Sequence, residues 1–155
     1  PRFIKYDSQN WQIEAIHRII KKNNLEDVAI LLPHNEDVLN IHRQLSAIGG
    51  NYEMKYNDKD FTNNKDTLDF DSTNPKIMTY HSAKGLQFEA VFLPFIEDFE
   101  EVDDNGKSSR KALYVAMTRT YRYLYIMYTG RLPSPLSNID KNLYKENEVD
   151  TVEDW

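Results

Sequence analysis

Residues Asp27–Pro33 read Asp-Val-Ala-Ile-Leu-Leu-Pro, which is an apolar run without polar alternation. A strand with one solvated face alternates apolar and polar residues, whereas a strand buried on both faces is apolar throughout. This run therefore predicts a strand inside a parallel sheet that is covered on both sides.

Helical patterns flank this strand. After a short apolar run at Phe3–Tyr6, Ser8 can cap a helix whose apolar positions are spaced at i, i+3 and i+7. Beyond the strand, Asn35 is expected to cap a second helix, which ends at Gly49 and Gly50, either of which can take the left-handed C-terminal position. The apolar positions of the two helices are Ile13, Ile16 and Ile20, and Val38, Ile41, Leu45 and Ile48.

The second half of the chain repeats the alternation. Residues 76–80, 90–94 and 123–128 are strand candidates, and residues 110–120 form a helix candidate between the last two. Residues 57–75 are rich in Asn, Asp and Thr and are predicted to be a long surface excursion. The predicted fold class is α/β, with a mainly parallel sheet and helices on both faces.

Composition excludes several classes of protein. The chain has no cysteine, so disulfides, thiol catalysis and cysteine zinc sites are excluded and a cytoplasmic setting is expected. The four histidines lack metal-ligand spacing, and no apolar run is long enough to cross a membrane. We therefore expect neither a metal site nor a membrane partner. Because the chain begins at Pro1 rather than Met, we expect it to be a piece of a longer protein.

The net charge of −6 argues at first against a nucleic-acid partner. However, residues 97–104 and 140–155 each hold six carboxylates, whereas residues 105–139 hold none. The cations of this acid-free stretch are Lys107, Arg110, Lys111, Arg119, Arg122 and Arg131. The charge therefore excludes only a uniformly basic surface.

The loop after the strand at 76–80 is a first candidate site, because ligands of open parallel sheets bind at loops beyond strand ends. It combines hydroxyl and imidazole groups, a cation and a glycine that permits close approach: Thr79, His81, Ser82, Lys84 and Gly85. Such a loop can bind phosphate, or it can be a tight connection with Lys84 in solvent.

Arg119 is a second candidate, placed at the end of the predicted helix and directly before a strand. A guanidinium suits phosphate because its planar fork donates two parallel hydrogen bonds. A cation at a helix C-terminus also stabilises the helix dipole, so a simple helix cap is the alternative.

Gly106, Lys107 and Ser108 match the end of a Walker A loop, but Glu101 stands where that loop requires glycine. The preceding residues are acidic and would repel a triphosphate. The chain therefore lacks a Walker A loop of its own.

The two accepted candidates together resemble a known family. Residues 79–94 resemble motif V of the UvrD/Rep/PcrA class of superfamily 1 helicases, written T-x-H-x-x-K-G-L-E-F. Residues 110–120 resemble motif VI, whose core is L-Y-V-A-x-T-R-A, and residues 28–35 match the strand that opens the second motor domain. The resemblance spans roughly residues 8–130.

This resemblance implies a RecA-like, P-loop NTPase type, second motor domain of an ATP-dependent DNA helicase. ATP and Mg²⁺ would bind only together with an N-terminal RecA-like domain that supplies the Walker residues, so this fragment alone is expected to be inactive. Arg119 would be catalytic and reach the γ-phosphate, while Gly85 and Gln87 would lie near the ribose and phosphates. A trans-acting arginine of this kind is worth roughly 10³–10⁵ in rate. The residues implied to contact single-stranded or duplex DNA are Thr79, His81, Ser82 and Lys84.

The sequence departs from the family pattern at several positions. Gln87 replaces the usual Glu, Thr120 and Tyr121 follow the motif VI arginine in place of Ala and Lys, and Ala112 replaces a larger residue. The motif IV arginine either precedes Pro1 or is absent. These changes weaken the expectation of tight nucleotide binding.

Residues 1–134 are expected to form the motor domain, and residues 135–155 a short helical turn and an acidic tail. One alternative function is a non-catalytic RecA-like regulatory or protein-interaction module. Another is a single-strand binder that stacks bases on Tyr121, Tyr123, Tyr125 and Tyr128.

Overall fold

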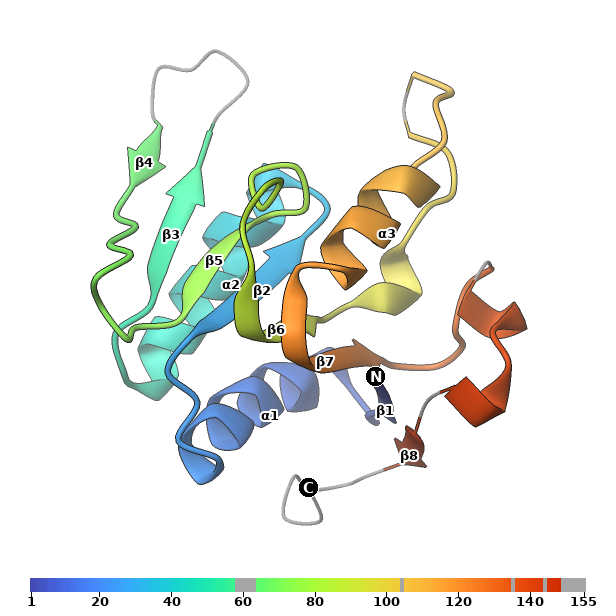
Figure 1. The fold of residues 1–155 in the computed structure, drawn as a ribbon, viewed down its shortest axis with the longest axis horizontal. Helices are drawn as coiled ribbons and strands as arrows, with labels where there is room; N and C mark the ends of the chain where they lie inside the picture. Colours follow the sequence, from blue (N-terminus) through green and yellow to red (C-terminus); the bar gives the residue numbers. More distant parts are fainter. Residues whose placement is uncertain (58–63, 104, 135, 144, 149–155) are drawn as a thin grey trace.

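The structure is a computed structural model that describes residues 1–57, 64–103, 105–134, 136–143 and 145–148. Its strands form a single twisted layer (Figure 1). Within these residues, eight strands pair in the order β4-β3-β5-β2-β6-β7-β1-β8. Every pair is parallel except β3 with β4. The bounds are β1 (Arg2–Lys5), β2 (Val28–Leu32), β3 (Glu53–Tyr56), β4 (Lys65–Asp66), β5 (Lys76–Thr79), β6 (Phe88–Leu93), β7 (Thr120–Tyr128) and β8 (Lys145–Glu148).

The central strand β2 confirms the sequence prediction. All five of its residues are buried, and it pairs with β5 on one side and β6 on the other. A strand in this position has no solvated face, which explains its uninterrupted apolar sequence.

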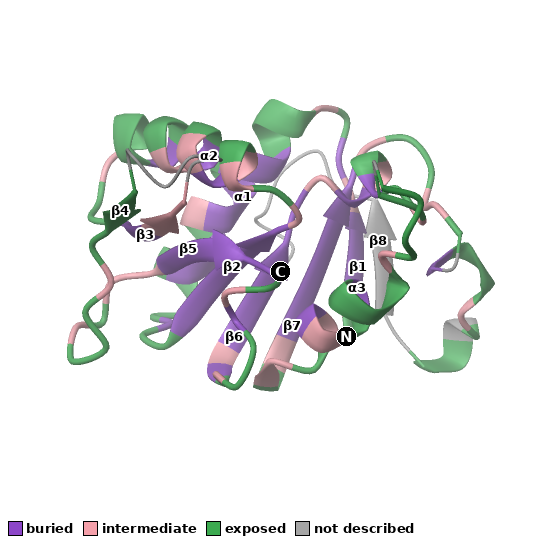
Figure 2. Ribbon diagram, turned by 90° about the horizontal axis from the view of Figure 1, so that it is seen from above, coloured by how far each residue is buried: buried purple, intermediate pink, exposed green. Residues whose placement is uncertain are grey.

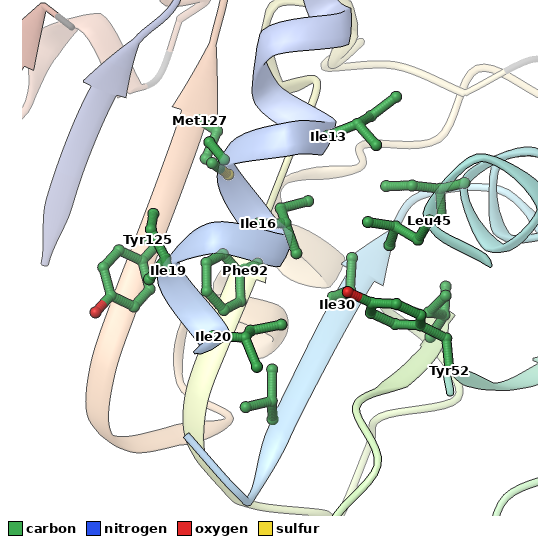
Figure 3. Close-up of a cluster of buried hydrophobic side chains, with 14 of the residues drawn as sticks. Ile13, Ile16, Ile19, Ile20, Ile30, Leu45, Tyr52, Phe92, Tyr125 and Met127 are labelled. Atoms are coloured by element: carbon green, nitrogen blue, oxygen red, sulfur yellow. The ribbon is translucent and has the colours of Figure 1, made fainter. Parts of the chain in front are cut away.

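Helices cover one face of the sheet. They are α1 (Gln9–Lys22) and α2 (Asn35–Ile48), which lie on the same side of the strands (Figure 2). Ile13, Ile16 and Ile19 of α1 pack towards Phe92 and Met127 of the sheet (Figure 3). Each fully buried isoleucine of this kind contributes about 1.5–3 kcal/mol relative to exposure.

The opposite face is covered more thinly. Its cover consists of the short helix α3 (Arg110–Met117), the 3₁₀ turns η1 (Ile96–Asp98) and η2 (Leu136–Asn138), and the loop 80–87 (Figure 2). Leu113 and Ala83 are fully buried in the core on this side. The expectation of helices on both faces is therefore confirmed.

Several predicted boundaries were wrong. The helix after β2 is capped by His34 rather than Asn35, whose side-chain oxygen instead accepts a hydrogen bond from the Asn57 amide at 3.2 Å. The end of that helix at Gly49 was predicted correctly, although Gly49 has φ 126° and ψ 156°, which is a positive φ but not the left-handed helical conformation. The third helix ends at Met117 rather than Thr120.

Three strands were not predicted. β3 precedes the excursion expected at 57–75, and β4 lies within it, where the two form an antiparallel pair. β8 pairs with β1, so residues 145–148 of the expected C-terminal segment join the sheet, next to the 3₁₀ turn η3 (Lys141–Leu143). The rest of the expected acidic tail, residues 149–155, lies outside the described residues. In the part of the chain that the structure describes, no helix has the length and apolar character needed to span a membrane.

Candidate functional site

The first half of the predicted phosphate loop is built around Thr79, the last residue of β5. Its side chain is buried, and its hydroxyl accepts a hydrogen bond from the Ser82 amide at 3.1 Å and donates one to the Ser82 hydroxyl at 3.1 Å. Thr79 therefore fixes the turn that presents Ser82 and His81.

Successive tight turns then carry the chain onward. The amides of Ala83, Lys84 and Leu86 donate to the carbonyls of residues 79, 81 and 83 respectively, at 3.0–3.2 Å. Ala83 is fully buried and anchors the loop, while Gly85 has φ +84°, an angle that L side chains rarely adopt. The exposed residues of the loop are His81, Lys84, Gly85 and Gln87.

The loop crosses from one end of the strands to the other, because β5 and β6 both run parallel to β2 (Figure 1). His81 and Ser82 therefore lie at the carboxyl-terminal edge of the sheet, where β5 ends. Gln87 lies at the amino-terminal edge, directly before β6. The loop therefore connects the carboxyl-terminal edge of the sheet to its amino-terminal edge.

Arg119 lies beside Gln87 at the amino-terminal edge. The backbone carbonyl of Arg119 accepts a hydrogen bond of 2.8 Å from the Phe88 amide, and β7 begins at the next residue. The structure thus brings together Gln87 and Arg119, which are 32 positions apart in the sequence.

The Arg119 side chain turns back onto the end of α3. Its Nε donates to the Val115 carbonyl at 3.0 Å, and one terminal nitrogen, Nη2, donates to the Thr118 hydroxyl at 3.2 Å. The Thr118 hydroxyl in turn donates to the same Val115 carbonyl at 2.9 Å. Arg119 therefore caps the helix, while its Nη1 has no hydrogen bond to the described residues. The interpretation as a helix cap and the interpretation as a phosphate-binding residue are thus compatible.

The Gly106-Lys107-Ser108 segment is not a phosphate loop in the structure either. The Asp103 carboxylate accepts hydrogen bonds from the Asn105 and Lys107 amides, each at 2.9 Å. Those backbone donors would have to face a phosphate in a Walker A loop. Because the Asp103 carboxylate already accepts hydrogen bonds from these amides, they are not available to a phosphate.

The tyrosine platform is contradicted by burial. Tyr125 is 3% exposed and stacks on Phe92 with ring centroids 4.7 Å apart, and Tyr128 is also buried. Tyr121 is exposed, but its hydroxyl donates to the Asp27 carboxylate at 3.3 Å. The four rings therefore cannot form one base-stacking surface.

The residues at the amino-terminal edge have the chemistry to bind part of a nucleotide. Gln87 is exposed, Gly85 leaves space around its Cα, since a Cβ built there meets nothing within 4 Å, and Arg119 supplies a positive charge. The described residues contain no group of three or more His, Asp and Glu side chains that could hold a metal ion. Gln87, Gly85 and Arg119 are chemically suited to contacts with a ribose and phosphates.

Sequence reasoning missed the hollow at the opposite edge. It contains Tyr80 from the loop after β5, and Asp98 and Glu100 from the segment between β6 and α3. No motif spacing connects these residues, so only the fold could bring them together.

The chain has the fold of RecA-like helicase C-terminal domains. The C-terminal domain of a possible DNA helicase from Lactobacillus plantarum WCFS1 matches with a TM-score of 0.70 at 18% identity, over 95% of this chain and 84% of that one. The C-terminal domain of the DEAD-box protein Dbp5 matches with a TM-score of 0.61 at 12% identity, over 96% and 89% of the two chains. At these identities the likeness shows the fold.

Part of the chain also resembles known helicases in sequence. Residues 57–131 match the model of the UvrD-like helicase C-terminal domain, a range that includes both the 79–94 and 110–120 segments. The chain is 38% identical over 82 residues to the ATP-dependent DNA helicase PcrA of Staphylococcus aureus, covering 45% of this chain and 11% of the relative. It is 39% identical over 61 residues to DNA helicase II of Rickettsia typhi, covering 34% and 9%. Residues 57–131 therefore resemble a UvrD-like helicase C-terminal domain in sequence, and the matches span about a tenth of the length of these relatives.

Proposed function

We propose that this chain is the second motor domain of an ATP-dependent DNA helicase or translocase. It would complete an ATP site whose Walker A lysine and Walker B acid come from an N-terminal RecA-like domain. The observation that carries the proposal is the hydrogen bond between Phe88 and Arg119, because it holds the ends of both helicase-like segments side by side at one sheet edge.

Arg119 is the catalytic residue in this proposal. Hydrolysis of bound ATP with Mg²⁺ supplies the free energy for movement, and the charge that develops on the transferred phosphoryl group must be neutralised. Nη1 of Arg119 can point across a domain interface while Nε and Nη2 stay bound to the end of α3. The helix end thus holds the guanidinium in a defined orientation.

Gly85 and Gln87 contact the ribose and phosphates. Gly85 allows the turn, and the Gln87 amide can hydrogen-bond a ribose hydroxyl without adding a negative charge near the phosphates. Gln87 makes no hydrogen bond to the described residues, so its amide is available.

DNA contacts lie at the other end of the loop. His81, Ser82 and Lys84 offer donors to the DNA backbone, and Thr79 orients the turn that carries them. Because the loop is continuous between the two edges, movement at the nucleotide end can shift the DNA end. The partners in this proposal are single-stranded or duplex DNA and the N-terminal motor domain.

The second candidate function is a non-catalytic RecA-like module. It is favoured by the capping contacts of Arg119 and by the neutral Gln87, since both arrangements are stable without nucleotide. The two functions predict different behaviour of Arg119 in the assembled protein.

The test is ATP turnover by this domain joined to a UvrD-like N-terminal motor domain, with and without DNA. Arg119→Ala should lower the DNA-stimulated rate by about 10³-fold or more. Arg43→Ala is the matched control, because Arg43 is exposed on α2 and has no hydrogen bond or ion pair with the described residues. An unchanged rate in Arg119→Ala would contradict the role of this residue and favour the non-catalytic module.

A further inference from the structure

A hollow of about 260 Å³ opens at the carboxyl-terminal edge of the sheet, beside the loop after β5. The ends of β2, β5 and β6 surround it, together with the first turn of α3. It lies at the opposite end of the strands from Gln87 and Arg119. Neither of those residues lines it.

The charged and titratable groups of the hollow, apart from the Tyr80 phenol, are three carboxylates and the imidazoles of His34 and His81. Asp98, Glu100 and Asp103 line it, and no Lys or Arg of the described residues does so. Asp98 is held by the Gln9 side-chain amide at 2.8 Å, and Asp103 by the two backbone amides of its own turn. Glu100 has no hydrogen bond or ion pair with the described residues, so its charge faces the hollow uncompensated.

The nearest guanidinium of the chain is engaged elsewhere. Arg110, the first residue of α3, pairs with Glu101 at 2.7 Å. Neither of these residues lines the hollow. The fold therefore places three acids around a space that no described cation of this chain fills.

Tyr80 is an independent indication that the hollow receives a ligand with hydrogen-bond donors. Its side chain is only 4% exposed, it lines the hollow, and its hydroxyl has no hydrogen-bond partner among the described residues. The hydroxyl is not fully enclosed by protein, so its oxygen is open to the hollow. Burial raises the pKa of Tyr80, so the phenol stays neutral and its oxygen can accept a hydrogen bond.

The walls of the hollow are apolar and aromatic. Phe99 and Pro33 lie beside the Tyr80 ring in its lining. Aromatic faces attract cations, and guanidinium is the protein cation that combines ring stacking with bidentate binding to carboxylates. A phosphate would be repelled by the three acids, and a lysine ammonium would not use the flat walls.

We propose that this hollow binds the guanidinium group of an arginine side chain presented by a partner polypeptide. The carboxylates of Glu100 and Asp98 accept its hydrogen bonds, and the Tyr80 oxygen accepts another. The site differs from the nucleotide contacts proposed above and shares only His81 with the proposed DNA contacts, so its existence does not depend on them.

The test is an NMR titration of the ¹⁵N-labelled chain with a blocked Gly-Arg-Gly peptide at low salt. The matched probe is Gly-citrulline-Gly, which keeps the shape of the side chain and removes its charge. The arginine peptide should shift the amide signals of Tyr80, His81 and Phe99 in a saturable way, whereas the citrulline peptide should not.

Two variants locate the effect. Glu100→Gln should weaken peptide binding about two- to fivefold, as expected for one exposed charge pair. Tyr80→Phe should weaken it about threefold through the lost hydrogen bond. Neither variant removes a hydrogen bond from the described structure, so both should fold. Glu26→Gln is the control, because Glu26 is an exposed carboxylate before β2 at the other end of the strands.

The proposal is overturned if the two peptides shift the same signals equally, or if Glu100→Gln binds like the original chain. It is also overturned if inorganic phosphate, rather than the arginine peptide, shifts these amides. None of these results would bear on the effect of Arg119→Ala on ATP turnover.

Discussion

The two ends of the parallel strands differ in how their polar groups are held. At the carboxyl-terminal edge, Gln12 is fully buried and connects three elements: its side chain donates to Glu97 at 3.1 Å and to Thr129 at 2.9 Å, and accepts from the Phe95 amide at 2.7 Å. At the centre of the amino-terminal edge, Gln87 is exposed, and among the described residues the Arg119 side chain hydrogen-bonds only to the end of its own helix.

The difference separates two kinds of role. The Gln12 network fixes the loops after β1, β6 and β7 relative to one another, and it holds Phe95 at φ 59°, a left-handed conformation that is uncommon for a bulky residue. The amino-terminal edge keeps a cation and an amide that can change partners without breaking the core. We infer that the first edge provides rigidity and that the second edge meets the nucleotide.

Removal of the Gln12 side chain should have the largest effect on stability. Gln12→Ala leaves the Phe95 amide and the Thr129 hydroxyl without this partner in a buried setting, so the free energy of unfolding should fall by about 2–4 kcal/mol. Urea denaturation measures this change. Gln44→Ala, an exposed glutamine on α2, should change stability by less than about 0.5 kcal/mol, and equal effects would contradict the rigid role of the network.

Glu53 extends the comparison of the two sheet edges, because it is a buried charged group at the amino-terminal edge. Its carboxylate lies 3.3 Å from the Lys76 ammonium and accepts hydrogen bonds from the Asp69 amide, Ser72 and Asn74. Burial alone would raise the pKa of Glu53, but these hydrogen bonds outweigh it and the pKa is lowered. Glu53→Gln should therefore destabilise the chain by about 1–3 kcal/mol at neutral pH.

The pH dependence of Glu53 has a defined sign. A carboxyl whose pKa is lower in the folded state stabilises the fold above the unfolded pKa of about 4.3, and this contribution is lost as the pH falls through the folded pKa. The stability difference between the original chain and Glu53→Gln should thus shrink below about pH 4. Thermal unfolding at pH 7 and pH 3 measures it, and Glu26→Gln should show no such change.

The fold was predictable from sequence wherever burial dictates residue type. The strand β2 and helix α1 were correct because their apolar spacing reports directly on the core, and Ser8 caps α1 through the Trp11 amide as expected. Strand β8 was missed because its sequence, Lys-Glu-Asn-Glu, contains no apolar residue. A polar edge strand carries no apolar pattern to detect.

The candidate site was predictable only in part. The loop at 79–87 and Arg119 could be identified as phosphate-binding candidates from residue types and order in the chain. The sequence did not show that the two ends of this loop lie at opposite edges of the sheet. The hydrogen bond from the Arg119 side chain to Val115 depends on where α3 ends, which helical spacing does not determine. The acidic hollow beside Tyr80 depends on long-range packing and has no local signal.

The smallest expected effect concerns the contact that orients Arg119. Thr118→Val removes a hydroxyl that accepts from the guanidinium at 3.2 Å on the protein surface, so stability should change by no more than about 0.5 kcal/mol. The Arg119 Nε proton should nevertheless exchange faster with solvent in NMR spectra, because the side chain loses one of its two restraints. Thr118→Ser should retain the slow exchange, and the same rate in all three proteins would show that Thr118 does not position Arg119.

The central claim is that the amino-terminal edge meets the transferred phosphoryl group through Arg119. The most direct measurement compares the binding of ADP·AlF₄⁻, a transition-state analogue, with that of a non-hydrolysable ATP analogue, in this domain joined to an N-terminal motor domain. Arg119→Ala should weaken binding of the transition-state analogue about 10²-fold or more while changing ATP-analogue binding far less, since only the former resembles the charge of the transition state. Equal affinities of both analogues in Arg119→Ala and in the original protein would contradict the account.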